Sequence, residues 1–204
     1  MATPDGPVPT PQEALERLRA GNARFVDGES HVPTVQKSVI ASLADGQRPW
    51  ATILGCSDSR VSPEVIFDAG LGELFVIRVA GNVLGPSING TLQYAGTHLR
   101  TPLFVVLGHE GCGAVDAALA SRFHGTEHKE RIEILLEHIV PALDGLDPSQ
   151  PHDDLLHAAV EANVRRTVET LRATPEASES LATRGMMLVG AVYDLASGRV
   201  RFLT

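Results

Sequence analysis

The stretch LFVVLGHEGCGAV, residues 103–115, combines the two features that decide the fold of this chain. It opens with an apolar run, Leu103–Leu107, that lacks the polar alternation of a half-exposed strand, and it continues directly into a glycine-rich turn. Strands that are buried on both faces have this composition. The stretch therefore predicts a central strand of a parallel sheet, followed by a turn into a helix.

Two apolar runs upstream have the same character, and each is followed by glycine or polar residues. They are Ala51–Leu54 and Leu74–Val79. We expect helices between the runs, at about Ser62–Ala69 and Ser87–Leu99, and a third helix at Ala114–His124. This alternation of strands and helices is typical of an α/β protein with right-handed crossovers between parallel strands.

The flanks of this region also show regular patterns. Residues 10–28 begin with a capping threonine and a proline and predict an amphipathic helix, whose apolar side is a candidate for packing on a neighbouring subunit. Glu127–Leu143 predicts a second amphipathic helix that Pro141 should end or kink, and Asp153–Ala173 predicts a long one. Met187–Val192 predicts a strand that a turn at 196–198 connects to a short alternating strand.

Composition limits the class of protein. A chain of 204 residues with 43% hydrophobic residues can bury one substantial core, so we expect a single domain over 1–204, with 1–9 as a flexible N-terminus. The formal net charge is −8 and the basic residues are dispersed, so nucleic acid is not an expected partner. The sequence shows neither a secretory signal nor an apolar membrane span, so we expect no membrane association and a cytoplasmic location.

The chain has two cysteines, Cys56 and Cys112, and each follows a predicted strand. A disulfide between them is possible, but paired cysteines near a histidine in a chain without an export signal more often bind metal or take part in catalysis. Ligands of α/β sheets bind beyond the carboxyl ends of the strands, where both cysteine motifs should meet. Two thiolates and the imidazole of His109 would be three zinc ligands, with a fourth position for water.

Taken one at a time, these residues have simpler interpretations. A lone cysteine is usually a small buried hydrophobe, and a lone histidine is usually satisfied in the core. Asp58 and Arg60 could be a surface ion pair of little energetic value. Beside a cation, Arg60 could instead hold Asp58 ionised and turned away from the metal, free to accept a hydrogen bond from zinc-bound water, whereas Asp58 as a fourth ligand would close the site.

The combination GCSDSRV, RVAGN and GHEGCGAV, in this order, resembles the β-class carbonic anhydrases from about Gln12 to the last strand. The resemblance implies a mainly parallel β-sheet with an antiparallel edge strand, flanked by helices, and an obligate homodimer or a dimer of dimers. It also implies one Zn²⁺ per subunit on Cys56, His109 and Cys112, with Asp58 and Arg60 as the catalytic dyad. The implied reaction is the reversible hydration of carbon dioxide to bicarbonate through a zinc-bound hydroxide.

Further roles follow from the plant-like branch of that family, which has a glutamine and a tyrosine at the positions of Gln47 and Tyr94. Gln47 would hydrogen-bond the substrate, and Tyr94 would either line the site or belong to the core. Phe75 and Ala80 would form an apolar pocket wall. Gly113 begins a helix whose positive end would favour the Cys112 thiolate and an anionic product.

The chain also departs from the family pattern. Val79 stands where the family commonly has asparagine, and Glu110-Gly111 where it commonly has serine or threonine followed by aspartate. Ile53 stands where the bicarbonate-regulated branch has tryptophan. We keep two other functions open, a carbonyl sulfide or carbon disulfide hydrolase on the same scaffold and a non-catalytic zinc-binding module.

Overall fold

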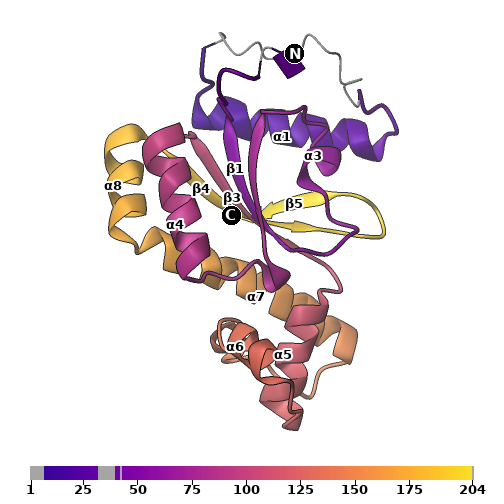
Figure 1. Cartoon of the computed structure of the whole chain (residues 1–204). Helices are drawn as coiled ribbons and strands as arrows, with labels where there is room; N and C mark the ends of the chain where they lie inside the picture. Colours follow the sequence, from indigo (N-terminus) through magenta and orange to yellow (C-terminus); the bar gives the residue numbers. More distant parts are fainter. Residues whose placement is uncertain (1–6, 32–39, 42, 204) are drawn as a thin grey trace.

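The computed structural model describes residues 7–31, 40–41 and 43–203, so residues 1–6 of the predicted flexible N-terminus lie outside the described part. The described strands form one sheet in the order β2-β1-β3-β4-β5 (Figure 1). Strands β2, β1, β3 and β4 are parallel to one another, and β5 is antiparallel to β4. This confirms the predicted sheet with an antiparallel edge strand. The strands are β1 (Ala51–Gly55), β2 (Leu74–Arg78), β3 (Leu103–His109), β4 (Met187–Tyr193) and β5 (Val200–Leu203).

Strand register decides where the chemistry can lie. Gly55 at the end of β1 is paired with Arg78 on one side and with Leu107 on the other. The carboxyl ends of these strands therefore reach one edge of the sheet, and β3 extends beyond it to His109. Every residue of β1 and β3 is buried, as predicted, but β2 is mostly half-buried because it is an edge strand among the described residues.

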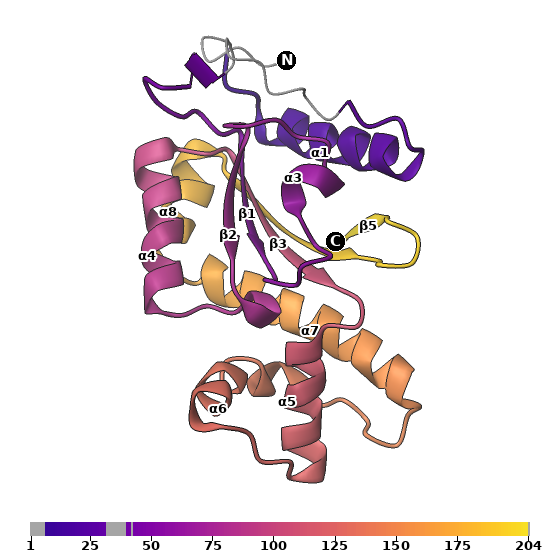
Figure 2. The same ribbon diagram turned by 45° about the vertical axis from the view of Figure 1, so that its right-hand side comes forward.

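Helices cover both faces of the sheet (Figure 2). Side chains alternate between the faces along each strand, so Ile53 and Val105 belong to one apolar cluster while Leu54 and Val106 belong to the other. The helical segments of the described chain are α1 (Pro11–Val26), α3 (Pro63–Ile66), η1 (Ala80–Asn82), α4 (Pro86–Tyr94), η2 (Ala95–Leu99), α5 (Gly113–His124), α6 (Glu130–Leu136), η3 (Val140–Leu143), α7 (His152–Arg172) and α8 (Pro175–Arg184).

The apolar side of the first helix, α1, packs on its own chain and not, as expected, on a neighbouring subunit. Thr10 caps α1 through a reciprocal bond with Glu13, as the capping sequence predicts. Its apolar side packs inside the chain, because Ala14 and Leu18 are fully buried in one cluster with Trp50. That side is therefore not available to a neighbouring subunit.

Three predicted helices are interrupted or shortened. The segment 127–143 is divided into α6 and the short 3-10 helix η3, and Pro141, which has no amide hydrogen for an intrahelical bond, lies within η3. The helix expected at 62–69 is the single turn α3, which Asp68 terminates with a φ of 47°. After Tyr94 the backbone of α4 widens into the π-helical turn η2.

The longest element without a counterpart in the sequence-based predictions is α8. Helix α8 follows α7 after a two-residue break, with Thr174 as its side-chain cap. Within the described residues, none of the helices is both long and apolar enough to cross a membrane.

Candidate metal centre

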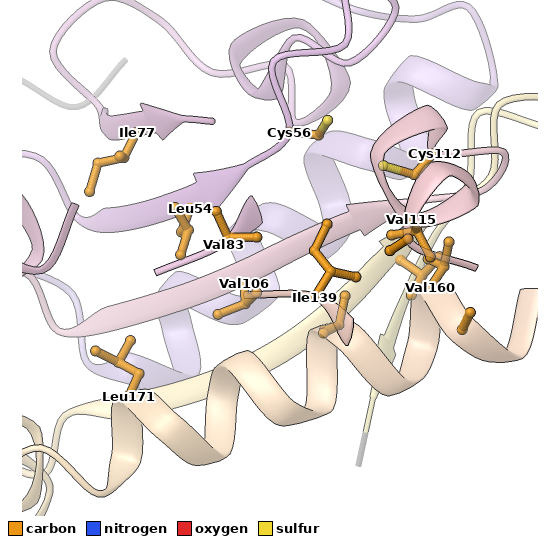
Figure 3. Packing of buried hydrophobic residues seen from close by; sticks show 14 of the residues in the cluster. Leu54, Cys56, Ile77, Val83, Val106, Cys112, Val115, Ile139, Val160 and Leu171 are labelled. Atoms are coloured by element: carbon orange, nitrogen blue, oxygen red, sulfur yellow. The ribbon is translucent and has the colours of Figure 1, made fainter. Parts of the chain in front are cut away.

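The candidate metal centre lies at the carboxyl edge of the sheet. Cys56 directly follows β1, His109 is the last residue of β3, and Cys112 precedes the first turn of α5. Gly111, with a φ of 62°, provides the left-handed backbone that turns the chain from β3 into α5. The two sulfur atoms and an imidazole nitrogen all lie within 4.8 Å of one another, and Figure 3 shows the two cysteines approaching from different elements.

The orientation of His109 suits metal binding. Its Nδ1 lies 2.9 Å from the carbonyl oxygen of Glu110, so Nδ1–H donates to this carbonyl and the lone pair is on Nε2. The side chain is fully buried, and Nε2 has no hydrogen-bond partner in the described chain. An unpaired buried acceptor costs about 1–3 kcal/mol, which a metal ion at this position would offset.

The two thiols cannot both ionise without a cation. A hydrogen bond from Cys112, supported by the Gly81 amide, lowers the pKa of Cys56 to about 4 against the opposing effect of burial. The same bond and burial raise the pKa of the Cys112 thiol far above its ordinary range. A second negative charge in this buried place requires a positive partner, and soft thiolates with imidazole favour zinc over magnesium or calcium. The donor set therefore fits zinc.

Asp58 and Arg60 form a bidentate ion pair beside these ligands. Arg60 Nε lies 2.9 Å from Asp58 Oδ1, and Arg60 Nη2 lies 2.7 Å from Oδ2. The guanidinium, together with the Arg60 amide, holds the pKa of the Asp58 carboxyl well below its usual range. Asp58 Oδ2 is 3.8 Å from His109 Nε2, so an ionised carboxylate faces the metal position while its strongest bonds go to Arg60.

Two further groups support the cysteine loop, and sequence reasoning missed both. Arg78, the last residue of β2, donates from Nε to the Cys56 carbonyl at 3.0 Å and from Nη2 to the Asp58 carbonyl at 2.6 Å. The Gly81 amide donates to the Cys56 sulfur at 3.4 Å. Both residues belong to the RVAGN motif, so its position after a strand was the signal available in the sequence.

The structure places Ala80 and Gly113 at the same edge as the ligands. Ala80 begins η1 and adjoins Gly81, and Gly113 begins α5 directly after Cys112. Gly113 is exposed, and a Cβ there would meet nothing within 4 Å. These positions agree with the predicted pocket wall and helix start, although their roles stay predictions.

Gln47, Phe75 and Tyr94 lie away from the metal ligands of their own chain. Gln47 precedes β1, which separates it from Cys56 by about 16 Å of extended chain. Phe75 is near the amino end of β2, and its ring centroid is 6.2 Å from that of Tyr94. Tyr94 is 43% exposed, so it is not an ordinary core residue. The three residues are therefore near the amino edge of the sheet, and the structure does not bring them to the metal centre.

A pocket of about 410 Å³ lies elsewhere, between α4, η2 and α8. Leu92, Phe104 and Leu171 contribute to its apolar lining, and a hydrogen bond of 2.8 Å joins Gln93 to Glu176 beside it. None of the candidate metal ligands lines this pocket. The metal centre, and not the pocket, has the chemistry of an active site.

An open α/β sheet that carries a buried two-cysteine, one-histidine cluster beside an Asp-Arg pair defines a zinc protein with a candidate catalytic site. The sequence pattern of the carbonic anhydrase family matches residues 51–200. "Carbonic anhydrase 2" of Mycobacterium tuberculosis is 40% identical over 199 residues, which cover 95% of this chain and 93% of the relative. A carbonic anhydrase of Mycolicibacterium smegmatis is 39% identical, covering 95% and 94%.

Solved structures show the same likeness. The β-carbonic anhydrase CafA of Aspergillus fumigatus superposes with a TM-score of 0.75 at 28% identity, covering 94% of this chain and 89% of that one. A Coccomyxa β-carbonic anhydrase in complex with acetazolamide gives 0.72 at 28% identity, covering 93% and 86%. The chain belongs to the carbonic anhydrase family, and within it to the β class.

Proposed function

We propose that this chain catalyses the reversible hydration of carbon dioxide to bicarbonate and a proton, with one Zn²⁺ per subunit on Cys56, His109 and Cys112. The observation that carries the proposal is the Asp58–Arg60 pair, whose carboxylate lies 3.8 Å from the unpaired nitrogen of His109. A purely structural zinc site has no use for such a pair. Bound zinc would supply an acidified water, which is the nucleophile that carbon dioxide needs.

The roles of the protein groups follow from their protonation and contacts. Asp58 is ionised over the working pH range because Arg60 holds its pKa down, so its carboxylate only accepts hydrogen bonds. In this state it would orient a water at the metal position by accepting a hydrogen bond from it. Arg60 fixes the orientation of the Asp58 carboxylate, and Arg78 holds the loop that carries both Cys56 and Asp58.

A homodimer, or a dimer of such dimers, is part of the proposal. Within the described residues no strand covers the outer side of β2, and exposed Leu71 and Tyr94 lie near this edge. A twofold axis at the β2 edge would set the amino end of one β2 beside the carboxyl end of its partner. Gln47, Phe75 and Tyr94 of one subunit would then serve the metal centre of the other, with Gln47 hydrogen-bonding the substrate.

Complementation tests this shared site. Asp58→Asn and Gln47→Leu subunits should each form nearly inactive homodimers. Co-expressed, they should form a mixed dimer in which one of two sites has both residues intact, and activity should return. If mixed dimers form without any gain in activity, the shared site is wrong.

The ligand and Asp58 roles are tested by rapid-mixing carbon dioxide hydration together with metal analysis. Cys56→Ser should lose zinc, whereas Asp58→Asn should retain zinc and lose about 100-fold of kcat/KM, as expected when the group that orients the attacking water is removed. An active Asp58→Asn enzyme with full zinc would contradict the role of Asp58.

Two alternative functions are separated by simple measurements. A carbonyl sulfide or carbon disulfide hydrolase would turn over its sulfur substrate faster than carbon dioxide in a side-by-side assay. A non-catalytic zinc module would bind zinc without turning over either. Assignment to the plant-like branch stays a prediction that rests on Gln47 and Tyr94, and we propose a cytoplasmic location because both thiols are free.

A further inference from the structure

Helix α7 buries the side-chain amide of Asn163 in a stripe that is apolar except for Asn163 and Thr167. Its buried residues include Val160 and Val164, which pack in the cluster that also contains Cys56 and Cys112. Asn163 lies between them and is 2% exposed. Burying an amide without partners costs about 1–3 kcal/mol, so its position in this stripe needs a specific bond.

That bond goes to the loop after β2. Asn163 Nδ2 donates to the carbonyl oxygen of Gly81 at 2.9 Å, across 82 positions of sequence. The peptide unit that carries this carbonyl is also held by the Asn82 amide, which donates to the Val79 carbonyl at 3.0 Å. The Asn163 side chain therefore fixes one specific peptide unit of η1.

The η1 backbone would not adopt this shape without such support. Gly81 has a φ of 68° and Asn82 a φ of 45°, so two successive residues are left-handed and the second is not glycine. Strained backbone of this kind persists only where the surrounding structure imposes it. Glycine at position 81 is required as well, because a Cβ there would lie 2.7 Å from Cδ1 of Ile139.

The consequence appears at the metal centre, because the N–H of Gly81 donates to the Cys56 sulfur at 3.4 Å. We propose that Asn163 is a positioning residue of the zinc site, whose side-chain amide holds Gly81 so that the Gly81 N–H remains directed at the Cys56 thiolate. Glycine rotates freely about both backbone bonds, so without the Asn163 bond the amide can turn away from the sulfur.

An amide that donates to a metal-bound thiolate withdraws charge from sulfur and stabilises its anionic form. Partners of this kind behind the ligands typically change metal affinity or activity by 10–100-fold. Asn163 donates to the Gly81 carbonyl and not to a ligand atom, so its effect must pass through Gly81. This inference rests on the ligand set of the proposed function.

The test uses the full-length protein with Zn²⁺ and with Co²⁺ as a spectroscopic probe. Asn163→Leu has a similar shape and removes the donor, and Asn163→Asp places a carboxylate against the Gly81 carbonyl. Zinc dissociation constants come from chelator competition, and thiolate-to-cobalt charge-transfer absorption reports on the sulfur ligands. Both variants should bind zinc about 10-fold more weakly and shift the charge-transfer band.

Thr167→Val is the matched control, because Thr167 lies one turn further along the same buried stripe. It should match the wild type in zinc affinity and cobalt spectrum. Wild-type values in either folded Asn163 variant would overturn the inference, and so would an equal change in Thr167→Val, which would indicate a general packing effect. Absence of thiolate-to-cobalt absorption in the wild type would instead refute the ligand set.

Discussion

Gly108 offers a sharp test of how β3 and α7 together position His109. A Cβ at Gly108 would lie 2.5 Å from Cγ2 of Val164 and 3.5 Å from Cγ1 of Val160. Carbon atoms in contact are ordinarily about 3.5–4.0 Å apart, so Gly108→Ala creates an overlap of about 1 Å with Val164. The valine is fully buried in a helix, where its χ1 angle is nearly fixed, so strand and helix must separate.

Overpacking of this size destabilises a protein by about 1–3 kcal/mol. For a chain of this length the free-energy loss corresponds to a Tm lower by about 2–12 °C. Because Gly108 adjoins His109, zinc affinity and carbon dioxide hydration should fall as well. Thermal unfolding, zinc titration and rapid-mixing activity would measure the three effects.

Val164→Ala relieves the same overlap. Alone, it should cost about 2 kcal/mol through lost burial and a cavity. The double variant Gly108→Ala/Val164→Ala should lose less unfolding free energy than the two single variants lose in sum, by about 1–3 kcal/mol. Gly90→Ala is the control, since a Cβ at this exposed helical position meets nothing within 4 Å. A Gly108→Ala protein as stable as the wild type would refute the reasoning.

Three further predictions concern pH and metal. The buried Asp68 carboxylate accepts bonds from Arg24 Nε at 2.6 Å and the His31 amide at 2.8 Å, and these outweigh burial and lower its pKa. Its stabilising effect is present above the ordinary carboxyl pKa of about 3.9 and is lost as pH falls through the lower folded value. Asp68→Asn should therefore lower the free energy of unfolding by about 2 kcal/mol at pH 7. The difference in unfolding free energy between variant and wild type should narrow below about pH 4, and an equal difference at pH 3 would contradict this. Two thiolates cancel the formal charge of zinc, so carbon dioxide hydration should rise from about pH 6.5 to 9, and a flat profile would count against it. Removal of zinc by a chelator should lower the Tm, because an ion at 100-fold its dissociation constant contributes about 2.7 kcal/mol, and an unchanged Tm would mean that folding does not depend on the ion.

Sequence patterns were most informative where the controlling interactions are local. The cap at Thr10, the buried character of β1 and β3, and the placement of Cys56 and His109 at strand ends all follow from neighbouring residues. Parallel strands bring their carboxyl ends to one edge, so convergence of the two motifs was predictable without coordinates. The sequence does not predict helix α8, and it predicts a longer helix over 127–143 than the one that forms.

The sequence by itself determined the ligand types, their order and their position after buried strands, because these depend on composition and local periodicity. Only the tertiary structure decided which side chains support the backbone around the zinc ligands. Arg78 reaches the Cys56 loop because strand pairing aligns it with Gly55, and Asn163 reaches Gly81 because α7 packs across the sheet. Polar side chains such as these could bond to many backbone groups, and the packing of elements distant in sequence selects the one that they meet.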